Sequence, residues 1–141
     1  MNINWKTIGL VFAGGTVGTL LRFSFDISLG SLLSVAAVNI VGSGLIGWFN
    51  SDPRVANIGR RMFLAVGFTG GFTTMSGVAL LTASGIAVPL SSGQSVSMGL
   101  FGFVFLIFSA SLLAYWGAHA LGERLTGNNA PVSHDVEEVT E

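Results

Sequence analysis

The feature that most constrains this chain is a long uncharged run: no Asp, Glu, Lys or Arg occurs between Arg61 and Glu123. Roughly 20 apolar residues of helix cross a bilayer, so a run of this length predicts more than one membrane span. Its first half contains the segment 67–78, Gly-Phe-Thr-Gly-Gly-Phe-Thr-Thr-Met-Ser-Gly-Val. Glycine lowers helix stability, and threonine hydroxyls compete for backbone carbonyls. We therefore expect a membrane helix that is broken in this segment.

Two interpretations of the segment 67–78 follow from its residues. Bare backbone at membrane depth survives only where protein or a water-filled cavity covers it, and broken helices commonly use their freed carbonyls to bind ions. Small residues three to four positions apart also let two helices pack closely, with no ion involved. The residues alone leave both the ion site and the helix crossing open.

Composition assigns the chain to the integral membrane proteins. Its 141 residues form one domain at most; half of them are hydrophobic and only 9% are charged, too few for the surface of a soluble domain. The absence of cysteine excludes disulfides and thiol chemistry, and a net charge of −1 gives no basic field for nucleic acid. The membrane segments offer no nucleophile with a base and an orienting group, so we do not expect an enzyme.

Four apolar stretches predict an all-α integral membrane domain over residues 1–122. Residues 123–141 are polar and acidic, which predicts a disordered cytoplasmic tail. The third apolar stretch contains the predicted break. The four expected spans cover residues 7–23, 30–49, 62–88 and 96–121.

Polar side chains lie in or beside the first two spans. Arg22 closes the first span, where it either extends to the interface or contacts an ion directly. Asp26 can pair with Arg22 if the helix continues. Asn39 lies near the middle of the second span, where hydrocarbon satisfies none of the hydrogen bonds of its amide. We expect its amide either to bond another helix or to donate its NH2 group to a passing anion.

The distribution of basic residues predicts a single orientation in the membrane. Four spans put both termini and the 50–61 connection on one side. The positive-inside rule places the more basic side in the cytoplasm, so we expect both termini to be cytoplasmic in a multi-pass protein of the plasma membrane. The basic residues on that side are Lys6, Arg54, Arg60, Arg61 and Arg124, against Arg22 alone on the other.

Three segments resemble the three signatures of the CrcB/Fluc fluoride channel family. They occur in the family's order and spacing, and the resemblance covers roughly residues 5 to 122. The segments read Gly14-Gly-Thr-Val-Gly-Thr-Leu-Leu-Arg22, Val38-Asn-Ile-Val-Gly-Ser-Gly-Leu-Ile-Gly47 and Gly67-Phe-Thr-Gly-Gly-Phe-Thr-Thr-Met-Ser76.

This resemblance implies a small passive channel that exports cytoplasmic fluoride and so relieves its toxicity. It also implies an antiparallel, dual-topology dimer in the bilayer, whose broken third helices cross at the centre. Backbone carbonyls at the positions of Gly70 and Thr73 would hold a structural Na+ that is not transported. The resemblance places the pore asparagine at Asn39 and the first-span arginine at Arg22.

The chain departs from the family pattern in the expected fluoride path. The resemblance places two phenylalanines, whose electropositive ring edges can face an anion, where this chain has Met75 and Val78. The family's threonine four residues before the asparagine is Val35 here. The polar residues expected along the path are Asn39, Thr74, Ser76 and, on the fourth span, Ser109.

These departures and the charge asymmetry together predict a heterodimer. A homodimer of inverted copies needs a chain that inserts both ways, with little asymmetry of Lys and Arg. We therefore expect an inverted homologous partner that supplies the phenylalanines. Two alternatives are a non-conducting structural partner subunit and a small multidrug transporter. The transporter needs a membrane-embedded carboxylate, whereas Asp26 lies outside the apolar part of the first span and no Glu precedes Glu123.

Overall fold

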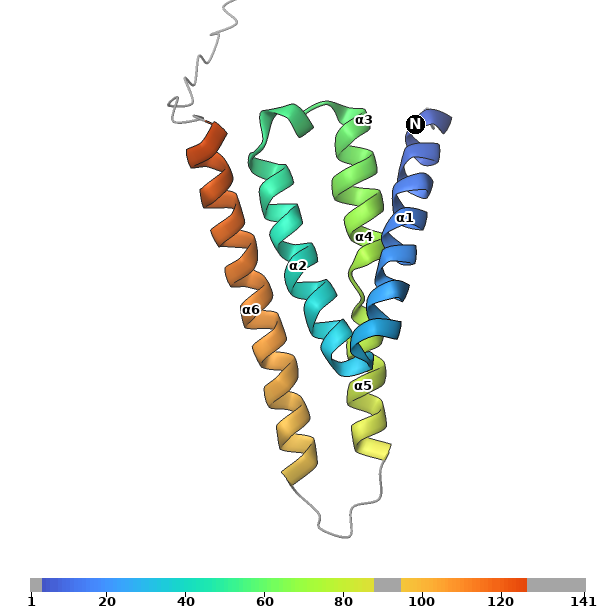
Figure 1. The fold of residues 1–141 in the computed structure, drawn as a ribbon, viewed down its shortest axis with the longest axis vertical. Helices are drawn as coiled ribbons and strands as arrows, with labels where there is room; N and C mark the ends of the chain where they lie inside the picture. Colours follow the sequence, from blue (N-terminus) through green and yellow to red (C-terminus); the bar gives the residue numbers. More distant parts are fainter. Residues whose placement is uncertain (1–3, 88–94, 127–141) are drawn as a thin grey trace, which may run out of the picture.

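The structure, a computed structural model, describes residues 4–87 and 95–126, and every regular element in these ranges is a helix. The helices form an elongated bundle (Figure 1). η1 is a short 3-10 helix and η2 is a π-helical segment. In chain order the elements are α1 (Trp5–Leu29), α2 (Ser31–Ser51), η1 (Pro53–Val55), α3 (Ile58–Arg61), η2 (Met62–Phe68), α4 (Thr69–Phe72), α5 (Met75–Ala87) and α6 (Ser95–Thr126).

The prediction of four membrane-length helices is confirmed. The start of α1, the connection from α2 to α3 and the end of α6 lie at the same end of the bundle, as four spans require (Figure 1). α6 continues four residues into the predicted tail, and the rest of that tail lies outside the described residues. The segments long and apolar enough to cross a membrane are Trp5–Leu29, Ser31–Ser51, Ile58–Leu80 and Phe101–Thr126.

The first helix is longer than predicted, because it continues beyond Arg22 to Leu29. Ser24 and Ser28 lie in this extension without ending it, since their hydroxyls donate to the carbonyls of Leu20 and Ser24 on the same helix. α1 ends at Gly30, whose φ of 75° is a left-handed conformation that suits glycine. Arg22 and Asp26 therefore both lie inside a helix.

The third helix is interrupted at Thr73 and Thr74, within the segment where the sequence predicts a break. α4 ends at Phe72, Thr73 is extended (φ −76°, ψ 157°), and α5 begins at Met75. The Thr74 hydroxyl accepts a hydrogen bond from the Gly77 amide at 3.0 Å, as an N-cap does. The depth of this break in the bilayer stays a prediction.

α1 packs against the third helix through a glycine seam, which consists of Gly14, Gly18, Gly67 and Gly71. A Cβ atom on Gly14 would overlap the carbonyl of Phe63, and one on Gly18 would overlap that of Phe68. Gly71 lies against the backbone of α1 in the same way, since a Cβ there would meet the Gly15 carbonyl. The helix-crossing interpretation therefore holds for this side of the broken segment.

The bundle has a small core and a largely apolar exterior. The most enclosed large side chain is Phe72, which stacks on Phe68 and meets the ring of Phe25 edge-on. By contrast, Trp5 and Phe12 are more than three quarters exposed, and many other large apolar residues are exposed to a smaller extent. A surface of this kind suits contact with lipid or with another membrane subunit.

Candidate ion path beside the helix break

Asn39 on α2 is joined to the break by a reciprocal pair of hydrogen bonds. Its Nδ2 donates to the Thr74 carbonyl at 3.1 Å, and its Oδ1 accepts from the Thr74 amide at 3.0 Å. Nδ2 also donates to the Val35 carbonyl at 2.9 Å, so both amide hydrogens are engaged. The side chain is only 8% exposed. Of the two roles expected for Asn39, the structure displays the interhelical hydrogen bond.

This pairing accounts for two of the backbone carbonyls that the break releases. In an unbroken helix the Thr74 amide would donate to Gly70 and the Gly77 amide to Thr73. Here the first amide donates to Asn39 and the second to the Thr74 hydroxyl. The carbonyls of Gly70 and Thr73 therefore lie outside the helical ladder.

These carbonyls are the oxygens to which the family resemblance assigns a structural Na+. Gly70 is exposed, and no atom lies within 4 Å of the position that a Cβ would take. The Thr73 carbonyl accepts a long hydrogen bond of 3.4 Å from an Arg22 guanidinium nitrogen. A carbonyl oxygen has two lone pairs, so this bond leaves room for a second partner. Neutral oxygen donors of this kind fit a small, hard cation.

A first cavity of about 330 Å³ lies between α2, α5 and α6. It brings together three predicted path residues, Asn39, Met75 and Val78. Its walls are mainly apolar side chains, with a few polar groups among them. From α6 it is lined by Phe108, Ser111 and Tyr115.

Ser109, the residue expected from the fourth span, does not line this cavity, whereas Ser111 does. The Ser111 hydroxyl is buried and has no hydrogen-bond partner among the described residues. Residues 104, 107, 111 and 115 recur at helical spacing on one face of α6. That spacing is the sequence signal that would have selected Ser111, but the apolar residues around the whole helix obscure it.

A second cavity of about 630 Å³ lies on the other side of the break. The predicted path residues Thr74 and Ser76 line it together with Arg22 and Asp26. The hydroxyls of Thr74 and Ser76 are 3.1 Å apart. Thr73 lines the first cavity and Thr74 the second, so the break lies between the two. Arg22 and Asp26 form no ion pair in this described part of the chain.

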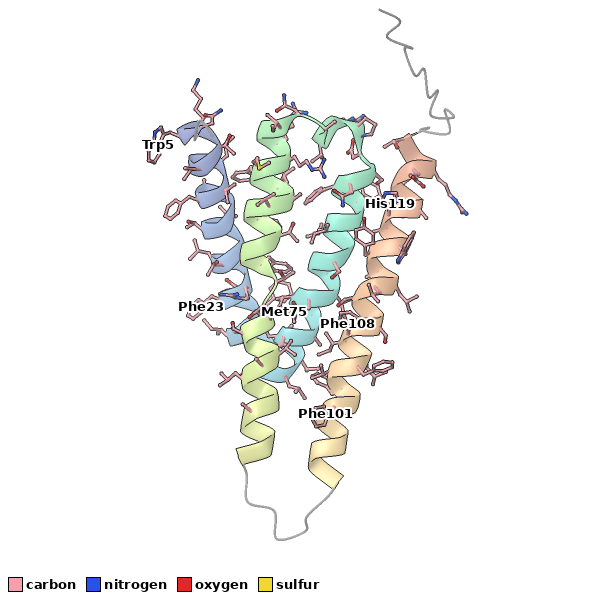
Figure 2. The ribbon with its side chains drawn as sticks, turned by 180° about the vertical axis from the view of Figure 1, so that it is seen from behind. Trp5, Phe23, Met75, Phe101, Phe108 and His119 are labelled. Carbon is pink, nitrogen blue, oxygen red and sulfur yellow. The ribbon has the colours of Figure 1, made fainter. Side chains whose placement is uncertain are left out.

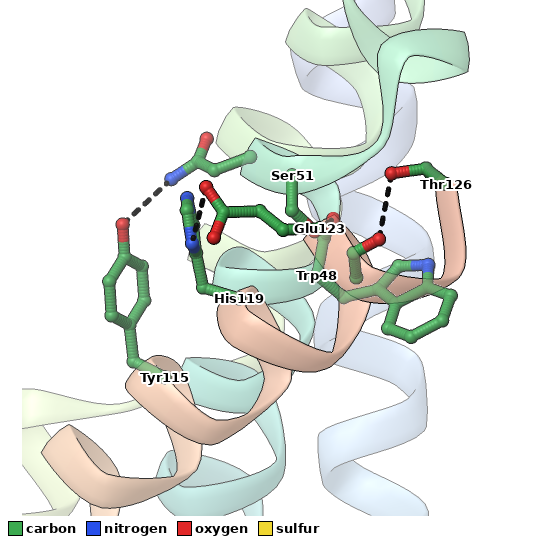
Figure 3. A network of polar contacts seen from close by, with 8 residues as sticks. Trp48, Ser51, Tyr115, His119, Glu123 and Thr126 are labelled. Carbon is green, nitrogen blue, oxygen red and sulfur yellow. Dashed lines mark hydrogen bonds and ion pairs between the residues drawn. The ribbon is translucent and has the colours of Figure 1, made fainter. Parts of the chain in front are cut away.

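A separate polar cluster lies where the ends of α2 and α6 meet (Figure 3). The Asn50 amide donates to the Tyr115 hydroxyl at 3.4 Å, and His119 Nδ1 lies 3.7 Å from Glu123 Oε1. No group of three or more His, Asp or Glu side chains that would hold a metal occurs in the parts of the chain that were placed. Tyr115 is the one member of the cluster that also lines the first cavity.

Comparison with known proteins gives the chain a family. A family model described as CrcB-like protein, Camphor Resistance (CrcB), matches residues 9–119. A Bacteroides fragilis protein named fluoride-specific ion channel FluC is 36% identical over 130 residues, 84% of this chain and 98% of that protein. Two Pseudomonas fluorescens proteins of the same name are 37% identical over 127 residues (83% and 97%) and 40% over 121 residues (79% and 92%). No solved structure matches the chain. With three signatures around a broken third helix and a match over most of its length, the chain belongs to the CrcB-like family.

Proposed function

We propose that this chain is a subunit of a passive fluoride channel that exports fluoride from the cytoplasm. The observation that carries the proposal is the pairing of Asn39 with Thr74 at the helix break, beside a cavity that holds further hydrogen-bond donors. The relatives are named as fluoride-specific ion channels, which supports the same ion here. The chain is not an enzyme.

The chemistry that the path needs follows from the hydration shell that fluoride gives up when it leaves water. Fluoride enters acidified cells as neutral HF and dissociates, and the negative-inside potential drives the anion out through a passive path. A narrow path must replace the hydration of this small anion with donors and still release it. Ser111 is the readiest donor because its hydroxyl has no other partner among the described residues.

Asn39 provides a second donor while it keeps its two hydrogen bonds to Thr74. Its bond to the Val35 carbonyl is the dispensable one, because in a helix that carbonyl also accepts the backbone amide of Asn39. Turning one Nδ2 hydrogen from Val35 to fluoride leaves both bonds to Thr74 in place. In the second cavity, which Asp26 and Ser31 also line, the donors that meet the anion are the hydroxyls of Thr74 and Ser76 and the Arg22 guanidinium.

A structural Na+ joins two subunits at the released carbonyls of Gly70 and Thr73. Two such carbonyls from each subunit would surround the ion without any carboxylate. The open space beside Gly70 supports this arrangement, because a second subunit can approach the backbone there. The bound ion would supply a fixed positive charge between the subunits.

The partner is an inverted homologue in the plasma membrane. Five basic residues lie at the end of the bundle where α1 begins and α6 ends, and all five are exposed. This distribution supports a single orientation with that end in the cytoplasm. Met75 is 77% exposed and carries no aromatic ring, which supports a partner that contributes phenylalanines. The same observation favours the alternative of a non-conducting structural subunit.

The test is fluoride efflux from liposomes, measured with a fluoride electrode, for the chain alone and for the chain co-purified with an inverted relative. We expect efflux of fluoride but not chloride with the partner, and weaker efflux from the chain alone. Absence of fluoride efflux in both preparations overturns the proposal. If efflux with the partner is unchanged by Asn39→Leu in this chain, the chain is the non-conducting subunit.

The transporter alternative is tested in the same liposomes. Asp26 lies inside α1 and lines the second cavity, closer to the membrane segments than the sequence predicts. A transporter would use this carboxylate to exchange protons for an organic cation. We expect no proton movement across the liposome membrane when organic cations are added. Proton movement that the substitution Asp26→Asn abolishes would instead establish a transporter.

A further inference from the structure

The first cavity contains an aromatic ring that comes from α6 and not from α5. Phe108 lines this cavity together with Met75 and Val78, the two residues at which the family resemblance places phenylalanines. Figure 2 shows Phe108 on α6 at about the level of Met75 on α5. The ring therefore lines the same cavity as the two α5 positions that carry no ring.

Phe108, Met75 and Val78 differ in the electrostatic potential that their side chains present to an anion. The edge of a phenyl ring is electropositive, because the ring's negative charge is concentrated on its faces. The thioether of Met75 and the methyl groups of Val78 present no comparable edge. In the first cavity the described residues of this chain offer two aromatic rings, Phe108 and Tyr115, both from α6. The Tyr115 hydroxyl accepts a hydrogen bond from Asn50 at the end of α2, whereas Phe108 lies at about the level of Met75.

Phe108 differs from its neighbours on the same helix. Phe101, Phe103 and Phe105 do not line the cavity. The ring of Phe108 is 62% exposed, so the core does not fix its direction, whereas the adjacent Ile107 is 6% exposed and anchors the backbone. Ser111 follows one turn later on the same cavity wall, and its hydroxyl has no partner within the described ranges.

We propose that Phe108 supplies the aromatic edge that fluoride passes in this subunit, in place of the phenylalanines absent from α5. This inference rests on the proposed function and deepens it, because it assigns the selectivity of this subunit's path to a residue of the fourth span. The ring edge and the Ser111 hydroxyl then act in succession along α6.

The first test compares substitutions at Phe108 in the complex that conducts fluoride. Phe108→Leu keeps an apolar side chain of similar size but removes the ring edge, so we expect fluoride efflux to fall about tenfold. Phe108→Tyr keeps the ring and is expected to keep most of the efflux. Phe105→Leu is the matched control, since Phe105 is a phenylalanine on the same helix, 70% exposed and outside the cavity. It is expected to leave efflux unchanged.

The second test restores the ring from the other wall. In the Phe108→Leu background, Met75→Phe places an aromatic side chain in the same cavity and is expected to recover efflux. Wild-type efflux from Phe108→Leu overturns this inference and leaves the proposed function intact. An equal loss in Phe108→Leu and Phe105→Leu, or in Phe108→Leu and Phe108→Tyr, also overturns it, because the effect would then not depend on a ring in the cavity. If the wild-type complex itself shows no fluoride efflux, the proposed function is overturned, and this inference is overturned with it.

Discussion

The two sides of the broken helix are built on opposite principles. On the side of α1, the glycine seam brings backbones so close that no Cβ atom fits at Gly14, Gly18 or Gly71. On the side of α2 and α6, the same segment borders a cavity of about 330 Å³, where the buried Ser111 hydroxyl has no hydrogen-bond partner in the described part of the chain. One side fixes the position of the break, and the other leaves room beside it.

The difference shows how a membrane protein can keep an interrupted helix. The break gives up helical hydrogen bonds, and hydrocarbon would not replace them. Asn39 compensates on the cavity side by bonding Thr74, while Thr19 and Arg22 reach the carbonyls of Gly71 and Thr73 from α1, each at 3.4 Å. Rigid packing and polar contacts therefore stabilise the same segment from different helices.

Enlarging a residue of the glycine seam should have the largest effect. Gly18→Leu forces α1 away from the third helix, because even a Cβ at this position would overlap the Phe68 carbonyl. We expect a loss of about 3 kcal/mol or more of folding stability, seen as a collapse of the thermal unfolding midpoint in detergent. The control Gly9→Leu lies on the same helix with no atom within 4 Å and should be tolerated. An equal fall of the unfolding midpoint in Gly18→Leu and Gly9→Leu would contradict the close packing of the glycine seam.

Removing the amide of Asn39 tests the cavity side. Asn39→Leu leaves the Thr74 amide and carbonyl without these partners, which should cost about 1–3 kcal/mol of stability and abolish fluoride efflux from this subunit's path. The control is Asn50→Leu, an exposed asparagine on the same helix whose amide makes one long bond to Tyr115. It should change stability by less than about 0.5 kcal/mol. A stable, conducting Asn39→Leu protein would show that the break needs no support from α2.

Neutralising Arg22 should have an intermediate effect. Its bond to the Thr73 carbonyl is long and the residue is half-buried, so Arg22→Gln should change stability little. The guanidinium is the positive charge of the second cavity, and its loss should lower fluoride efflux about fivefold, equivalent to about 1 kcal/mol. Arg54→Gln, at the opposite end, is the control for a general change in charge. If the two variants conduct alike, Arg22 serves only to hold the break.

The polar cluster at the end of α6 should matter least. Glu123→Gln weakens an exposed contact with His119 four residues earlier, which is worth less than about 0.5 kcal/mol. Fluoride efflux should be unchanged, because neither residue lines the first or the second cavity. A clear change in efflux would extend the path beyond Tyr115 to this end of the bundle.

Local features of the chain predicted the positions along the sequence but not the directions around each helix. Gly67, Gly70 and Gly71 with their neighbouring threonines were enough to place the break, since helix propensity is a local property. The sequence closes the first span at Arg22, whereas α1 continues to Leu29. Ser109 was chosen where Ser111 lines the cavity, and nothing in an apolar helix marks which face turns inward.

The sequence by itself determined the membrane class, the four helices and the interrupted third one, because hydropathy and backbone propensity act over a few residues. Only the tertiary structure decided how the break is used. The Thr74 amide leaves Gly70 for Asn39, a residue 35 positions earlier, and that exchange releases the carbonyl. Such a choice depends on the rotation and separation of packed helices, which the chain sets only when all of its elements meet.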